Sequence, residues 1–235
     1  MRILAPALLL FMAACGRGDP AANRAAPPPM NMVGPGPQQA LPPTISIAAD
    51  CAATWDGQAT TRLQITQRSE ALIQRAIEAV GGRQNFNIDD LPMPIVEAPA
   101  GLDMVCADTI LSALQRAGMP SVMLKLADGG AAVLMDFPTS TDRPPPPMPM
   151  ALGLHAGGRI TWNGNPIDEA GLSALLTRIG GSLAAPEEEA PPGDLELRVG
   201  RETTFGQLYG LLQTIRRYHL RPEVYLPSAQ EEAAR

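Results

Sequence analysis

The sequence repeats Trp55-Asp56-Gly57-Gln58 as Trp162-Asn163-Gly164-Asn165, and these two stretches contain both tryptophans of the chain. The offset of 107 residues (162 minus 55) also holds upstream, where Ile45 falls on Leu152. Downstream the offset drifts to about 101, as expected from small insertions in loops. Such a repeat predicts two copies of one small structural unit, so the function must be sought in what that unit does. The alternative is a chance similarity between two pairs of helices rich in Ala and Leu.

Hydrophobic periodicity predicts the same six elements in each copy, in the order strand, strand, helix, strand, helix, strand. In the first copy we expect them at 45–49, near Trp55, and at about 66–80, 94–98, 103–117 and 121–126. In the second copy we expect them at about 151–154, 160–162, 168–179, 195–199, 204–215 and 224–226. Asp168 and either Thr203 or Thr204 are the expected N-caps of the two later helices. The predicted fold class is therefore α+β, with two tandem ββαβαβ modules, each a small mixed sheet with two helices on one face.

The first fifteen residues have the pattern of an export signal. Arg2 precedes an apolar run over 3–12, and the small residues Ala13-Ala14 come directly before Cys15. The run is too short to span a bilayer, which needs about 20 residues. Cys15 in this setting resembles the lipobox of bacterial lipoproteins, which implies cleavage before Cys15 and a lipid anchor on it; an ordinary signal with an incidental cysteine is the alternative. Gly16 in place of Asp favours the outer membrane over the inner one.

Composition divides the chain into six parts. The segment after the signal is rich in Pro, Ala, Gly, Asn and Gln and cannot bury enough apolar surface to fold. The predicted parts are a signal peptide at 1–14, a tether at 15–43, module 1 at 44–127, a linker at 128–150, module 2 at 151–227 and a disordered tail at 228–235. The proline run at 144–147 belongs to this linker, or else it is an extended segment that docks on a sheet edge or on aromatic side chains.

Net charge bears on nucleic-acid binding, and cysteine content bears on disulfide formation. The net charge is −6 with no basic block, so we expect no nucleic-acid binding. With Cys15 lipidated, Cys51 and Cys106 form an even number in an oxidising compartment, which favours a disulfide between them. The alternative is that both cysteines are small buried hydrophobic residues.

Two stretches of the second copy resemble the periplasmic domain of the ExbD/TolR biopolymer-transport family. Residues 158–164 resemble its glycine turn, strand and Asn-Gly turn, and 195–226 its strand, helix and terminal strand. The segment 133–139 resembles its membrane-proximal part. The resemblance implies a domain that dimerises and contacts a TonB-like or TolA-like partner or the cell wall. It also implies a transmembrane helix with a proton-coupled Asp, but no long apolar run follows the signal, so Asp136 is expected to be a solvated loop acid.

The residue types that carry enzyme chemistry are sparse. His155 and His219 are the only histidines, and no metal-ligand spacing, phosphate loop or nucleophile motif accompanies them. The acidic run 187–189 and the pair Arg216-Arg217 are expected to be solvated. The sequence predicts no catalytic residue, no metal and no cofactor.

The expected function is therefore binding. We expect a non-enzymatic, lipid-anchored envelope protein, facing the periplasm, whose two modules pair as an internal pseudo-dimer and bind a partner in biopolymer transport or envelope maintenance. The alternative is an envelope hydrolase or a small-ligand-binding lipoprotein with a site between the modules.

Overall fold

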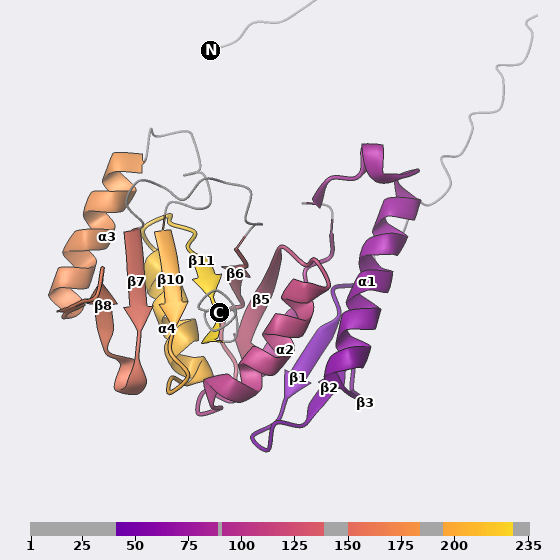
Figure 1. Cartoon of the computed structure of the whole chain (residues 1–235), viewed down its shortest axis with the longest axis horizontal. Helices are drawn as coiled ribbons and strands as arrows, with labels where there is room; N and C mark the ends of the chain where they lie inside the picture. The colour runs from indigo at the N-terminus through magenta and orange to yellow at the C-terminus, as the bar shows by residue number, and fades with distance from the viewer. Residues whose placement is uncertain (1–40, 89–90, 139–149, 184–194, 228–235) are drawn as a thin grey trace, which may run out of the picture. The chain divides into compact units, whose positions relative to one another are not determined.

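The structure, a computed structural model, describes residues 41–88, 91–138, 150–183 and 195–227. Within these ranges, eleven strands form one mixed sheet accompanied by four α-helices (Figure 1). The strands are β1 (Thr44–Ile47), β2 (Ala53–Trp55), β3 (Gln58–Thr60), β4 (Ile95–Ala98), β5 (Ser121–Leu126), β6 (Val133–Asp136), β7 (Met150–Leu154), β8 (Ile160–Trp162), β9 (Asn165–Ile167), β10 (Leu195–Val199) and β11 (Glu223–Tyr225). The helices are α1 (Arg62–Ala79), α2 (Met104–Arg116), α3 (Glu169–Leu183) and α4 (Phe205–Arg216).

The strand order across the sheet is β3-β2-β1-β4-β5-β6-β11-β10-β7-β8-β9. The prediction of helices with a mixed sheet is confirmed. The expectation of two separate small sheets is wrong, because β6 pairs with β5 on one side and with β11 on the other and joins all the strands. β6 lies in the stretch expected to be a linker. Its alternating burial, with Val133 and Met135 buried, is typical of a strand with one face on the core.

The two ends of the sheet pair their strands in the same way. β1 is antiparallel to β2 and parallel to β4, and β7 is likewise antiparallel to β8 and parallel to β10. β4 then pairs in parallel with β5, and β10 with β11. The predicted order omitted β3 and β9, the three-residue strands at the two edges. Pro166 hid β9, since proline usually ends a strand but is tolerated at a sheet edge.

A two-residue turn follows each tryptophan. Asp56 and Asn163 begin these turns with φ of 50° and 48°, a left-handed conformation that Asp and Asn tolerate in hairpins. Oδ1 of Asp56 accepts the backbone N–H of Thr44 at 2.8 Å, and Oδ1 of Asn163 accepts that of Ala151 at 3.0 Å. Both pairs of positions differ by the same 107 residues as the tryptophans, so the local backbone geometry repeats along with the sequence.

β5, which closes the first copy, and β11, which closes the second, align differently in the sheet than in the sequence. In the sheet Val96 lies opposite Leu124, and Leu197 lies opposite Val224. In the sequence, the apolar run 122–124 matches 224–226, which places Val122, not Leu124, on Val224. A shift of two residues keeps every side chain on the same face of a strand, so the apolar pattern could not distinguish the two alignments.

The first turns of α2 and α4 meet through reciprocal hydrogen bonds. The N–H of Met104 donates to the carbonyl of Thr203 at 2.9 Å, and the N–H of Phe205 donates to that of Leu102 at 2.8 Å. The N–H of Gly206 also donates to the carbonyl of Ala100 at 2.8 Å. These bonds satisfy N–H groups that a helix leaves without intrahelical partners, so each helix supports the start of the other.

Further contacts tie the two halves together. α4 packs against β5 and β6, and the hydroxyl of Tyr209 donates to the carbonyl of Ala131 at 2.7 Å. Asp136, at the end of β6, forms an ion pair with Arg221 at 2.9 Å, and its side chain is only 13% exposed. The expectation that Asp136 is a solvated loop acid is wrong, because β6 brings it beside β11 and the arginine that precedes β11.

Candidate binding groove beside the first tryptophan

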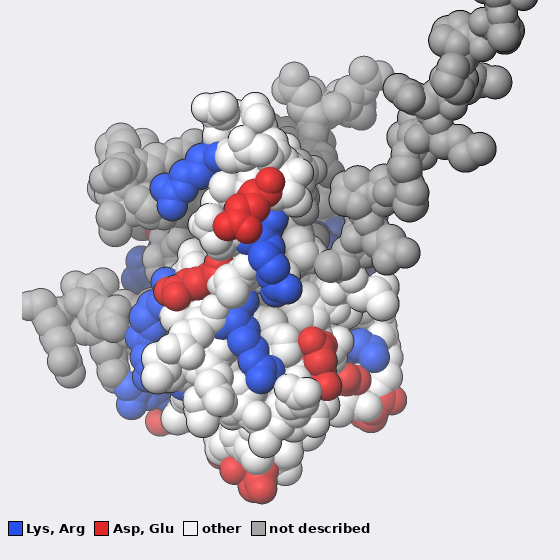
Figure 2. Space-filling model, turned by 90° about the vertical axis from the view of Figure 1, so that its right-hand side faces the viewer, with Lys and Arg blue, Asp and Glu red and all other residues white. Residues whose placement is uncertain are grey.

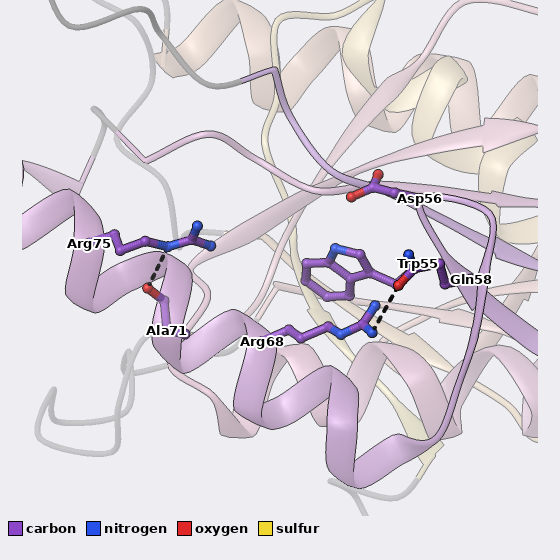
Figure 3. Close-up of a pocket in the computed structure, with 6 residues that line it drawn as sticks. All are labelled: Trp55, Asp56, Gln58, Arg68, Ala71 and Arg75. Carbon is purple, nitrogen blue, oxygen red and sulfur yellow. Dashed lines mark hydrogen bonds between the residues drawn. The ribbon is translucent and has the colours of Figure 1, made fainter.

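The hairpin of β2 and β3 and the flank of α1 enclose a surface hollow of about 290 Å³ (Figure 3). Six residues line this groove: Trp55, Asp56, Gln58, Arg68, Ala71 and Arg75. Trp55 is 7% exposed and forms the floor, since its ring belongs to the hydrophobic core on its inner side. The alternating burial of β2 places the Trp55 side chain on the core-facing side of the hairpin, where α1 also lines the groove.

α1 places its two arginines on one flank. The helix begins at Arg62, four residues earlier than predicted, because the Thr61 hydroxyl accepts the Gln64 N–H and the Gln64 side chain accepts the Thr61 N–H. Arg68 and Arg75 are seven residues apart, which brings both to the same side of a helix. This is the flank away from α2, since the opposite flank carries Thr66, whose hydroxyl contacts the carbonyl of Ala113.

The guanidinium groups are held differently. That of Arg68 lies over the Trp55 ring, 5.9 Å from its centroid, and donates to Oε1 of Gln58 at 3.5 Å. Nε of Arg75 donates to the carbonyl of Ala71 at 3.2 Å, which leaves its terminal nitrogens without a partner among the described residues. Figure 3 shows Arg68 and Arg75 along α1 with the tryptophan ring between the helix and Asp56.

The groove carries a small excess of positive charge. Arg68 and Arg75 face one carboxylate, that of Asp56, which already accepts the backbone N–H of Thr44. Figure 2 shows acidic and basic side chains interspersed over the α1 side of the molecule, so the positive charge is local to the groove. A planar guanidinium with unpaired N–H groups beside an aromatic ring suits a carboxylate or another planar anion.

A second polar cluster lies on β10 and β11. Arg198 donates to one Glu196 oxygen through both Nε and a terminal nitrogen, at 3.2 and 2.9 Å. The hydroxyl of Tyr225 donates to Glu223 at 3.4 Å. Burial, reinforced by the charges of Glu196 and Glu223, raises the pKa of Tyr225 to about 12.

The structure joins Cys51 and Cys106 in a disulfide, with Cα atoms 5.3 Å apart. Cys51 lies in the turn between β1 and β2, and Cys106 lies in the first turn of α2. Cys15, the expected lipidation site, lies outside the described residues, as do the acidic run 187–189 and the proline run 144–147.

The two histidines stand in separate local settings. His155 precedes the short 3-10 helix Ala156–Gly158, and its Nε2 lies 3.0 Å from the Thr161 hydroxyl. A Cβ on Gly153 would collide with this pair, so the glycine makes room for it. His219 follows α4 with φ of 59°, and it is exposed. Arg216 and Arg217 are also exposed at this helix end.

The described ranges contain no group of three or more His, Cys, Asp or Glu side chains placed to hold a metal ion. Over the same ranges, no helix has the length and apolar character required to cross a membrane. The chain matches no protein-family model, and no curated protein matches its sequence. The resemblance to the ExbD/TolR family therefore stays a prediction.

Sequence reasoning missed the arginines of the groove. Arg68 and Arg75 fell inside the predicted helix 66–80 but were not assigned a role. Their spacing of seven residues was the available signal, because it places both on one helix flank. What the sequence lacked was the position of Trp55, which required the packing of the β2–β3 hairpin against α1.

Proposed function

We propose that this chain is a lipid-anchored binding protein of the bacterial envelope, built from two ExbD/TolR-like modules paired as an internal pseudo-dimer. The observation that carries the proposal is the reciprocal pair of hydrogen bonds between α2 and α4. Each bond joins the first residue of one helix to the carbonyl two residues before the start of the other. Twofold-related subunits make contacts of this kind, in which each partner contributes the same groups.

The equivalent strand pairing at the two ends of the sheet supports the same arrangement. In a covalent pseudo-dimer the second module is always present at a high effective concentration, so no second chain is needed to complete the pair. We further propose that the chain performs no catalysis and translocates no protons of its own. Its partner would be a TonB-type or Tol-type protein or the cell wall, reached from the lipid on Cys15 through the tether.

The pseudo-dimer is tested by sedimentation equilibrium of the purified chain without its signal and lipid. We expect the mass of one chain over a wide concentration range, because the pairing surface is already occupied. A stable dimer that dissociates when the α2–α4 contact is disrupted would contradict the proposal, since it would show that the halves pair between chains.

The envelope function is tested in cells. Mass spectrometry of the mature N-terminus is expected to find a lipid-modified Cys15, and an unmodified start at another residue would contradict the anchor. Proximity labelling from the native protein is expected to recover transport components or cell-wall-associated proteins. Labelling that recovers only cytoplasmic proteins would contradict the envelope assignment.

A further inference from the structure

The two edges of the sheet differ in their capacity to accept another strand. Around β2, the N–H of Asp56 donates to Thr44 and that of Ala48 donates to Ala52. In an antiparallel pair, the backbone N–H and carbonyl groups of successive residues point alternately toward the neighbouring strand and away from it. Thr54 lies midway between these two bonds, so its N–H and carbonyl point toward β1. Its opposite residue in β3 is Ala59. The N–H and carbonyl of Ala59 therefore point outward from the edge of the sheet.

The same alternation holds at the other edge, where proline changes the result. The N–H of Asn163 donates to the carbonyl of Ala151, and that of His155 donates to the carbonyl of Arg159. The backbone N–H and carbonyl of Thr161 therefore point toward β7. The residue of β9 opposite Thr161 is Pro166, which has no N–H to offer. Proline on an edge strand is a common protection against pairing with another chain. β9 has this protection and β3 lacks it.

The two groove arginines also have no counterpart at the matching positions of the second copy. Arg68 and Arg75 line the flank of α1 that borders the groove above the β2–β3 hairpin (Figure 3). The 107-residue offset places Leu175 and Ser182 at the matching positions of the second copy. The second half therefore lacks both the outward N–H and the two arginines.

We propose that an extended acidic segment of a partner protein adds to the sheet beside β3, with its carboxylates at Arg68 and Arg75. This inference rests on the proposed binding function and names the surface and the kind of partner. Main-chain hydrogen bonds to Ala59 would fix the segment, as in other cases of strand addition. Alternate side chains of a strand lie on one face, about 7 Å apart. Acids at alternate positions would thus face α1, within reach of two long arginine side chains.

The test uses the purified chain without its signal and lipid, and a defined probe. The probe is a fluorescein-labelled ten-residue peptide of alternating Glu and Thr, and its binding is followed by fluorescence anisotropy. We expect saturable binding that weakens as salt is raised. The same peptide with Gln in place of Glu is expected to bind at least several-fold more weakly. A peptide with N-methyl groups on alternate backbone nitrogens tests the strand pairing without any change to the protein.

Matched variants locate the site. Arg75→Gln is expected to weaken binding of the Glu peptide about threefold to tenfold, the range of exposed to charge-assisted ion pairs. Ala59→Pro, which copies Pro166, is expected to reduce binding at least tenfold, since it removes the outward N–H. Arg178→Gln on α3, also an exposed arginine, is the control and is expected to leave binding unchanged. Far-UV circular dichroism verifies that each variant is folded.

Equal binding of the Glu and Gln peptides, or equal effects of Arg75→Gln and Arg178→Gln, would overturn the inference. So would tight binding of the N-methylated peptide, or a dimer of the free chain that Ala59→Pro dissociates, because β3 would then pair with a second copy. These outcomes differ from failure of the proposed function. Proximity labelling could recover an envelope partner whose capture is unaffected by Arg75→Gln. The proposed binding function would then stand, but the partner would bind another face of the protein.

Discussion

At the scale of single residues, Gly206 has the clearest structural role. A Cβ at this position would lie 2.7 Å from the carbonyl oxygen of Ala100 and 2.9 Å from its Cβ. Gly206→Ala must therefore separate the start of α4 from the loop before α2. We expect it to lower the free energy of unfolding by about 1–3 kcal/mol, the usual cost of overpacking, measured by urea denaturation.

Gly210 provides the matched control, one turn further along α4. A Cβ there would meet nothing within 4 Å. Gly210→Ala is expected to stabilise the protein by about 0.5–1 kcal/mol, because alanine favours the helix more than glycine does. Two Gly→Ala changes on one helix should thus act in opposite directions. Stabilisation by both would show that the contact with Ala100 yields easily and does not constrain the junction.

Tyr225 predicts a pH dependence at the alkaline end. Its pKa is raised to about 12 in the folded protein, first by burial and then by Glu196 and Glu223. The unfolded phenol ionises near its ordinary pKa of 10.0. The raised folded pKa means that this contribution to stability is fully present below about pH 10 and is lost as the pH rises towards 12. We expect unfolding experiments to show this decline in the natural protein.

The assignment is checked with Tyr225→Phe. The phenolate absorbance of the natural chain minus that of the variant isolates Tyr225 from Tyr209 and Tyr218. This difference should titrate near pH 12, and the variant should lose less stability than the natural chain between pH 10 and 12. A difference spectrum that titrates near pH 10 would contradict the assigned environment.

At the scale of elements, α4 depends on the cap at its first turn. The Thr204 hydroxyl accepts the Gln207 N–H at 3.3 Å, and the Gln207 side chain accepts the Thr204 N–H at 3.0 Å. Thr204→Ala should lower the free energy of unfolding by about 1 kcal/mol, whereas Thr204→Ser should retain most of the stabilisation from the cap. Thr203 is instead buried, with its hydroxyl donating to Gly200 at 2.7 Å. Equal stability of the Ala and Ser variants would mean that the cap is not needed.

Elements with a local cause could be predicted from the sequence, and those with a distant cause could not. The apolar residues of 121–126 and of α2 predicted strand and helix bounds close to those observed. β6 was missed because four residues between loops have no local signal, and their pairing depends on two strands from opposite halves of the chain. The candidate groove was missed for the same reason, since Trp55 and the α1 arginines meet only after the hairpin packs against the helix.

At the scale of the whole molecule, the two halves resemble each other in pairing but differ in what they expose. β6 lies in the middle of the sheet, between β5 of the first half and β11 of the second, and has no equivalent strand. The twofold relation between the halves therefore does not include it. The disulfide, the two groove arginines and the unprotected edge all belong to the first half. This division supports a first half that binds and a second half that completes the pair.

The disulfide tests how firmly the first half is fixed. It closes a segment of 55 residues between the β1–β2 turn and α2, and Cys106 lies two residues after Met104, which bonds to the second half. Loop-closure entropy predicts a contribution of about 4 kcal/mol for a loop of this size. Replacing both cysteines, as Cys51→Ser with Cys106→Ala, should lower the free energy of unfolding by about 2–4 kcal/mol in urea denaturation.

The residue chosen at position 51 should matter as well. Cys51 has φ of 68°, and the matching residue of the second half is Gly158, with φ of 75°. Because a side chain costs about 1 kcal/mol or more in this left-handed region, Cys51→Gly with Cys106→Ala should be more stable than the Ser and Ala pair. If the disulfide holds β1 and β2 against α2, the affinity of the groove for the Glu peptide should be highest in the natural chain. It should be lower in the Gly and Ala pair and lowest in the Ser and Ala pair. Unchanged stability on removal of both cysteines would contradict a structural role for the bond, and unchanged affinity with lowered stability would confine that role to folding.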